Sequence, residues 1–120
     1  MKLADLIARI DATKPNQYDK DLKTQWVNEI EYRAIDQVIN MARGNHRRYA
    51  PYVYDLDAEK ELAIPDMFVD VYVYYLSAKI DMLYSEIDRY NNDVLAYETA
   101  WKNYASWYRR NHYPKSIWEL

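Results

Sequence analysis

The sequence predicts an all-α protein, a small helical bundle built around one long C-terminal helix at about residues 66–110. Between residues 69 and 108 an apolar or aromatic side chain recurs at alternating steps of four and three residues, and neither Gly nor Pro interrupts the stretch. Such a stripe is typical of an amphipathic helix that buries one face. The spacing continues through the polar residues 91–93, so it predicts one helix of roughly 40 residues, about 60 Å long, rather than a hairpin. The repeating residues are Val69, Val73, Leu76, Ile80, Leu83, Ile87, Tyr90, Val94, Tyr97, Trp101, Tyr104 and Tyr108.

Two shorter helices are expected in the N-terminal part, over residues 2–11 and about 19–42. Pro15 ends the first, because proline disfavours helical geometry in the residue before it. Asp19 is placed to cap the second helix with its side chain, and Gly44 provides the C-terminal stop. The apolar faces consist of Leu3, Leu6, Ile7 and Ile10 in the first helix, and of Leu22, Trp26, Ile30, Ala34, Val38 and Met41 in the second.

Helical spacing disappears between residues 45 and 65, where we expect a long irregular or hairpin-like loop. A connection of about 20 residues is much longer than the usual ~4–6 and is commonly either functional or disordered. The aromatic side chains of this segment argue against disorder. We therefore interpret it as a contact element, with the candidate contact residues Arg47, Arg48, Tyr49, Tyr52 and Tyr54.

The long helix is expected to begin with Asp66 as its N-cap, and an extended C-terminal tail follows it at residues 111–120. Pro114 prevents a simple continuation of the helix. The tail carries more apolar surface than a solvated tail needs, at Tyr113, Ile117, Trp118 and Leu120. It therefore either folds back on the core or inserts into another protein, where a tryptophan is a common anchor.

Composition limits the possible classes of protein. At 120 residues the chain is expected to form one domain with a modest core. Half of the residues are hydrophobic, yet the mean hydropathy is −0.64, because 14 Tyr and four Trp supply much of the apolar bulk. The sequence contains no cysteine, which excludes disulfides and thiolate metal sites. It has neither a signal-peptide-like nor a membrane-spanning apolar run, so we expect a protein made in the cytoplasm with no membrane partner.

Charge is segregated along the chain, although the net charge is only −3. Basic side chains gather at residues 43–48 and again at 102–115, whereas acidic ones gather at 55–70. This order complements the dipole of the expected long helix, and it would also let the acidic end of one copy meet the basic end of another. The candidate inter-subunit residues are Asp55, Asp57, Glu59, Glu61, Arg109 and Arg110.

No residue pattern nominates a catalytic, metal or cofactor site, and we expect a protein that is not an enzyme and has no cofactor. The sequence has no Gly-rich phosphate motif, no nucleophile elbow and no H-E-x-x-H pair. His46 is interpreted as a solvated loop residue. Two groups of carboxylates are interpreted as exposed charges on amphipathic helices, namely Glu29 with Glu31, and Asp81 with Glu86 and Asp88.

A small helical regulatory or nucleic-acid-associated interaction protein is the alternative function. Arg43, Arg47 and Arg48 could contact phosphates, and the tyrosine-rich stripe could stack on bases. At heptad positions, however, aromatic side chains more often form a core or a helix–helix interface. The negative net charge also disfavours nucleic-acid binding as the main role.

Short segments spread over nearly the whole chain carry a family resemblance. In order they are Lys14-Pro15-Asn16, Trp26-Val27-Asn28-Glu29-Ile30-Glu31, residues 62–65, residues 72–81, Glu86, Arg89-Tyr90-Asn91-Asn92, and Tyr108-Arg109-Arg110-Asn111-His112-Tyr113-Pro114. Together they resemble the head–tail connector, or adaptor, proteins of tailed phages and prophages of Gram-positive bacteria.

The resemblance implies a single helical head–tail adaptor domain over residues 1–120, a structural virion protein of the neck that is made in the host cytoplasm. Such subunits form a ring, usually dodecameric, beneath the portal and join the DNA-filled capsid to the tail. The implied partners are the portal protein, neighbouring adaptor subunits and the next neck or tail-completion protein. Packaged DNA would pass through the channel without sequence-specific binding.

The resemblance also assigns roles to two segments by their position. Residues 111–120 would be the C-terminal docking arm, and residues 45–65 the distal or inter-subunit loop. The implied portal-docking residues are His112, Tyr113, Pro114, Ile117, Trp118 and Leu120.

Overall fold

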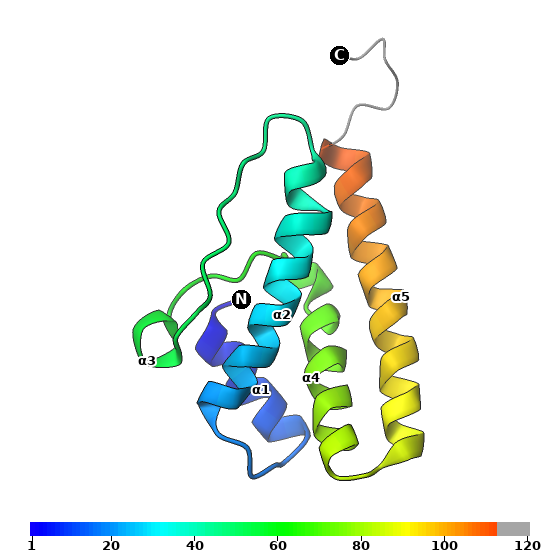
Figure 1. Ribbon diagram of the computed structural model, residues 1–120. Coiled ribbons are helices and arrows are strands. Elements are labelled where there is room, and N and C mark those ends of the chain that lie inside the picture. Colours follow the sequence, from blue (N-terminus) through cyan, green and yellow to red (C-terminus); the bar gives the residue numbers. More distant parts are fainter. Residues whose placement is uncertain (113–120) are drawn as a thin grey trace.

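The computed structural model describes residues 1–112, and this part of the chain is helical, with no β-strand. Helix α4 packs against α1, α2 and α5, while the short α3 lies on the opposite side of the molecule from α5 (Figure 1). The predicted all-α class with a long C-terminal helix is confirmed. The elements are α1 (Leu3–Thr13), α2 (Lys20–Gln37), the 3₁₀ helix η1 (Ile39–Met41), α3 (Tyr54–Asp57), the 3₁₀ helix η2 (Asp66–Phe68), α4 (Asp70–Leu83) and α5 (Ile87–His112).

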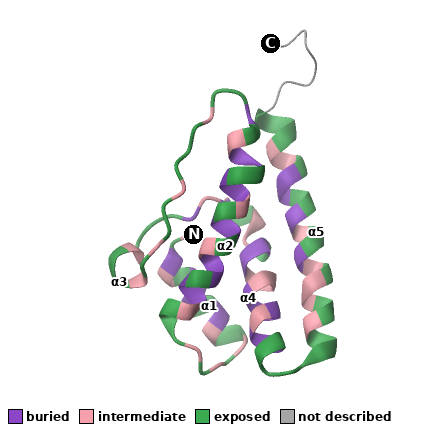
Figure 2. Cartoon of the chain, in the orientation of Figure 1, coloured by how far each residue is buried: buried purple, intermediate pink, exposed green. Residues whose placement is uncertain are grey.

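The hydrophobic core lies where the four longer helices face one another, and Figure 2 shows buried residues along the inner side of each. Both ends of the described chain contribute to it, since residues from the first turns of α1 and from the second half of α5 belong to one cluster. The fully buried members with large side chains include Leu3, Leu6, Ile7, Ile10, Ile30, Ile64, Tyr72, Leu76, Ile80 and Tyr104.

The prediction of one unbroken helix over residues 66–110 is wrong. The chain turns at residues 84–86, and α4 and α5 form an antiparallel hairpin (Figure 1). Ser85 has a φ of +60°, and the amide of Glu86 donates to the carbonyl of Asp81 at 2.9 Å. The apolar stripe therefore continues across the turn, but its two halves pack on each other. A straight rod of about 60 Å would need other partners to cover the same stripe.

The signals for the first two helices are largely confirmed. Helix α1 ends at Thr13, two residues before Pro15, and the carboxylate of Asp19 accepts a hydrogen bond from the amide of Leu22 at 2.8 Å as the N-cap of α2. Helix α2 ends earlier than predicted, because the backbone leaves helical geometry at residue 38 and continues as η1. Gly44, with a φ of +87°, lies in the turn after η1 and does not itself end α2.

The predicted capping role of Asp66 is also wrong. Asp66 begins η2, and α4 begins only at Asp70, after Val69, with no side-chain hydrogen bond at its N-cap. The carboxylate of Asp66 instead accepts a hydrogen bond from the amino group of Met1. The acidic side chain thus ties the beginning of the chain to the segment before α4.

The loop at residues 45–65 is irregular, as expected, and it pairs with the beginning of the chain rather than with itself. The amide of Leu3 donates to the carbonyl of Lys60 at 3.0 Å, and the amide of Leu62 donates to the carbonyl of Met1 at 2.9 Å. Leu62 and Ile64 are buried in the core. The second half of the loop is therefore a fixed part of the bundle.

Candidate functional site

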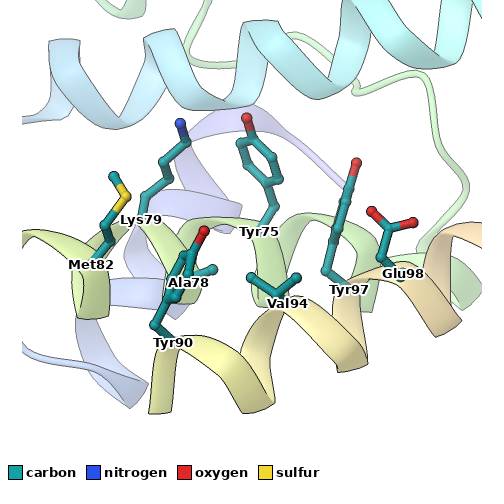
Figure 3. A pocket seen from close by; sticks show the side chains of 8 residues that line it. All are labelled: Tyr75, Ala78, Lys79, Met82, Tyr90, Val94, Tyr97 and Glu98. Carbon is teal, nitrogen blue, oxygen red and sulfur yellow. The ribbon is translucent and has the colours of Figure 1, made fainter. Parts of the chain in front are cut away.

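A groove runs along the seam between α4 and α5 on the side that faces α2 (Figure 3). It has a volume of about 260 Å³, and its walls are mostly aromatic and aliphatic. Its surface suits contact with the apolar side chains of another protein. The lining residues are Tyr75, Ala78, Lys79 and Met82 from α4, and Tyr90, Val94, Tyr97 and Glu98 from α5.

Two side chains of α2 hold the rim of this groove. The carboxylate of Glu29 accepts a hydrogen bond from the Tyr75 hydroxyl at 2.5 Å and lies 3.5 Å from the Lys79 amine. Arg33 donates to the Tyr97 hydroxyl at 2.7 Å, and its guanidinium lies 4.1 Å from the ring centre of Trp101. Burial, together with the hydrogen bond to Glu29, raises the pKa of Tyr75, so its hydroxyl stays protonated and remains a donor.

A second hollow of about 290 Å³ lies at the tip of the hairpin and shares Met82 and Tyr90 with the first. Four apolar side chains around the turn are between 42% and 67% exposed, namely Met82, Leu83, Tyr84 and Ile87, and we call them the tip cluster. The turn is held against the rest of the bundle, because the Tyr84 hydroxyl accepts a hydrogen bond from the amide of Gln17 at 3.0 Å. The tip cluster is therefore presented on a fixed backbone.

Beside the tip, a carboxyl pair links both helices of the hairpin to the end of α1. The amine of Lys14 binds the carboxylate of Asp81 on α4 and lies 3.4 Å from that of Asp93 on α5. Burial and a hydrogen bond shared with Asp81 raise the pKa of Asp93 to about 6. Burial also opposes ionisation of Asp81, but the hydrogen bonds from Asp93 and Lys14 outweigh it and lower the pKa of Asp81. Our interpretation of Asp81 as an exposed charge is wrong, because its side chain is buried.

The same correction applies to Glu31, which is only 1% exposed. Its carboxylate accepts hydrogen bonds from the Tyr72 hydroxyl, from the Tyr52 hydroxyl at 2.9 Å and from the amide of Ala63 at 2.9 Å. Glu31 thereby joins α2 to α4 and to the loop. Burial is the main cause, and the nearby charge of Glu31 the second, that raises the pKa of Tyr72 well above its usual value. Sequence reasoning missed this site, although the spacing of Val27, Glu31 and Ala34 puts Glu31 on the buried face of α2.

The aromatic candidates of the loop mainly contact their own chain. The Tyr52 hydroxyl binds Glu31, the Tyr49 ring packs edge-on against Tyr32 with 5.1 Å between ring centres, and the Lys20 amine lies 5.0 Å from the ring centre of Tyr54. Arg47 and Arg48 are exposed and line a hollow of about 210 Å³ between the loop and α2. The tyrosines of the loop therefore contribute to the fold, and the two arginines form its charged outer edge.

Three of the four acidic inter-subunit candidates are engaged within the chain. Glu59 pairs with Lys2 at 2.9 Å, Glu61 pairs with the Met1 amino group at 2.9 Å, and Asp57 accepts a hydrogen bond from the amide of Val53 at 2.8 Å. Asp55 is exposed and, within residues 1–112, makes no ion pair. The acidic segment is therefore less negative than its sequence indicates.

The basic candidates Arg109 and Arg110 are exposed in the last turns of α5, on the opposite side of the molecule from α3 (Figure 1). One chain does not bring its acidic and basic candidates together. Contact between them would have to come from two copies.

Of the portal-docking candidates, only His112 lies among the described residues. Its ring stacks on Tyr108 with 3.8 Å between ring centres and an angle of 10° between the planes. Its Nδ1 lies 3.0 Å from the carbonyl oxygen of Tyr108. The other candidates, Tyr113, Pro114, Ile117, Trp118 and Leu120, lie outside the described residues.

Three further findings concern the class of protein. Residues 1–112 contain no group of three potential ligands placed to hold a metal ion, and none of the helices described is long and apolar enough to cross a membrane. A scan against protein-family models found no match, and searches of curated proteins and of solved structures found none either. The resemblance to phage adaptors therefore remains a prediction from the sequence.

Proposed function

We propose that this protein is a structural, non-catalytic virion protein of the phage neck, a head–tail adaptor that forms a ring under the portal. The ring would join the DNA-filled capsid to the tail and leave a channel for the DNA. The resemblance of segments along nearly the whole chain to phage adaptors supports the assignment to this family.

The structural observation that supports a role in protein contact is the tip cluster. A contiguous group of exposed apolar side chains on a fixed turn is typical of a surface that another protein covers. The groove along the α4–α5 seam continues from this cluster, because the two hollows share Met82 and Tyr90. A partner that docks at the tip would therefore find a preformed apolar surface, and binding would need little rearrangement.

The shape of the hairpin supports a bridging role. Helix α5 has 26 residues and separates the tip from the end of the helix at His112. At ~1.5 Å per residue this separation is roughly 39 Å. We propose that residues 111–120 dock into the portal and that the tip cluster receives the next neck or tail-completion protein. The two partners would then be held at opposite ends of one rigid helix.

The portal-docking role is tested with a chain that lacks residues 112–120. Because the core cluster lies within residues 3–105, this chain should keep the helical circular-dichroism signal and the thermal unfolding of the full chain. It should lose binding to purified portal protein, measured by co-sedimentation. Portal binding at full strength by the truncated chain would refute the docking arm.

The copy number of the chain tests the wider proposal. Gradient-purified virions and DNA-filled heads should contain one ring of copies each, and free tails should contain none. Absence from all three particles would refute the proposal that this is a virion protein.

The alternative, a nucleic-acid-associated protein, has less support. Tyr97, Trp101 and Tyr104 are buried in the core, so they cannot stack on bases in this fold. Arg43, Arg47 and Arg48 remain exposed. DNA binding that falls steeply with salt concentration would favour this alternative, whereas portal binding should depend on salt far less.

A further inference from the structure

Two unlike surfaces on opposite sides of the molecule each carry one strongly exposed leucine. Leu56 on α3 is 81% exposed, and Leu95 on α5 is 69% exposed. In Figure 1 α3 and α5 lie at opposite edges, with α1, α2 and α4 between them. The two leucines of one chain therefore cannot cover each other.

The α3 surface is held firmly although it lies in the loop. The carboxylate of Asp57 accepts a hydrogen bond from the amide of Val53 at 2.8 Å, which closes the turn. The carbonyl of Ala58 accepts another from the amide of Ala4 at 2.8 Å and fixes α3 to α1. Leu56 is thus a preordered apolar projection, flanked by the exposed carboxylate of Asp55.

The α5 surface is a shallow hollow of about 360 Å³ beside Leu95. The small side chains of Ala96 and Ala100 form part of its lining, together with Tyr74 and the acidic Asp70 of α4. Lys102 follows Leu95 by seven residues, or nearly two helical turns, so both lie on the same outer face of α5. Lys102 is exposed and makes no ion pair within residues 1–112.

We propose that a second copy of this chain occupies the α5 hollow, with Leu56 of one copy packed against Leu95 of the next and Asp55 facing Lys102. The complementary charges support a second copy as the occupant. Asp55 is exposed and makes no ion pair within residues 1–112, and Lys102 is an exposed cation, likewise without an ion pair in that range, on the same face as Leu95. This inference rests on the proposed ring and names the surfaces that would build it.

Contact between two different surfaces of the same molecule is heterologous, so it closes into a ring when the rotation between copies allows it. Because the two surfaces lie on opposite flanks, neighbouring copies would stand side by side. The tip cluster and the C-terminal end of each α5 would then stay free for other partners.

Engineered cysteines test the contact directly, because the chain contains no cysteine of its own. We would prepare Leu56→Cys and Leu95→Cys as separate proteins, mix them in equal amounts at high concentration and oxidise them. Specific contact should give almost only the mixed 56–95 disulfide, resolved by mass spectrometry. The double variant should form a ladder of covalent oligomers. Random collision would give both homodimers, each at half the amount of the mixed dimer, and that result would overturn the proposal.

A matched control replaces Leu56→Cys by Met67→Cys, which sits at an exposed apolar position away from α3. Its mixed disulfide with Leu95→Cys should stay at the random level. Charge reversal adds a second test. Asp55→Lys in the Leu56→Cys protein and Lys102→Glu in the Leu95→Cys protein should each lower the yield of the 56–95 disulfide several-fold. Mixing the two charge-reversed proteins should restore that yield. No effect of either reversal would overturn the assigned pairing.

The outcome also separates this inference from the proposed function. Portal binding together with random disulfides would keep the adaptor role and reject the α3–α5 contact. A specific 56–95 disulfide without portal binding, and without the chain in virions, would keep the contact and reject the adaptor role.

Discussion

Replacing Tyr72 by Phe removes one oxygen atom from the centre of the bundle and tests what holds the loop to the helices. The Tyr72 hydroxyl donates to the buried carboxylate of Glu31 and accepts a hydrogen bond from the amide of Ile64 at 3.0 Å. All three residues are almost completely buried, so water cannot easily replace the lost partner. Glu31 would lose one of its three donors, and the Ile64 amide would lose its acceptor.

The magnitude follows from these two losses. A hydrogen bond to a charged group contributes about 1.5–3 kcal/mol, and a buried donor left without a partner costs about 1–3 kcal/mol. Because the losses overlap, we expect Tyr72→Phe to lower the free energy of unfolding by about 3 kcal/mol. That is a large fraction of the ~5–15 kcal/mol typical of a domain, and it should lower the Tm by roughly 10 °C.

Urea unfolding followed by far-ultraviolet circular dichroism measures this loss, with Tyr52→Phe as the matched control. Tyr52 also donates to Glu31, at 2.9 Å, but it is only half-buried, so its loss should cost about 1 kcal/mol. Equal losses for the two variants, or a loss below about 1 kcal/mol for Tyr72→Phe, would refute a fold that depends on the buried Glu31.

Two further changes concern the hairpin. The pKa of Asp93, raised from 3.8 to about 6, means that the folded state binds this proton more tightly, so its contribution to stability falls as the pH rises through that range. Asp93→Asn should flatten this fall and stabilise the fold by roughly 1 kcal/mol at pH 7. Urea unfolding of both proteins, measured across this pH range and at pH 7, checks the prediction. A variant whose stability depends on pH as in the original chain would contradict it. Ser85 has a φ of +60°, so Ser85→Gly should raise stability by about 0.5–1 kcal/mol, whereas Ser85→Ala should not. Equal thermal unfolding of the two Ser85 variants would contradict strain at this turn.

The short-range signals of the sequence predict the helices well. Pro15 and Asp19 act through their immediate neighbours, so their positions alone locate the end of α1 and the beginning of α2. The turn at residue 85 has no such signal, because it contains neither Gly nor Pro and the apolar spacing continues through it. Packing of α5 on α4 decides where the chain turns, and that information lies in contacts between distant residues.

The candidate site also depends on contacts between residues that are distant in the sequence. The aromatic content of the loop predicts a contact element, whereas the contacts that the structure shows are made within the chain, such as the one from Tyr52 to a carboxylate on α2. The residue type of Glu31 suggests an exposed charge, whereas its position between Val27 and Ala34 indicates the buried face. The sequence does not indicate the tip cluster, because Leu83 and Ile87 continue the stripe of an uninterrupted helix and become exposed only where the chain turns.

The core that joins both ends of the chain sets the order of events during synthesis. The buried face of α1 packs in the same cluster as Trp101 and Tyr104, and these two residues leave the ribosome about 90 residues later. At ~5–20 residues per second this interval lasts roughly 5–20 s. Until α4 and α5 emerge, the apolar faces of α1 and α2 can be covered only in part, by each other and by the loop between α2 and α4. The nascent N-terminal half therefore exposes apolar surface of the kind that chaperones bind, and the bundle can close only when synthesis is nearly complete.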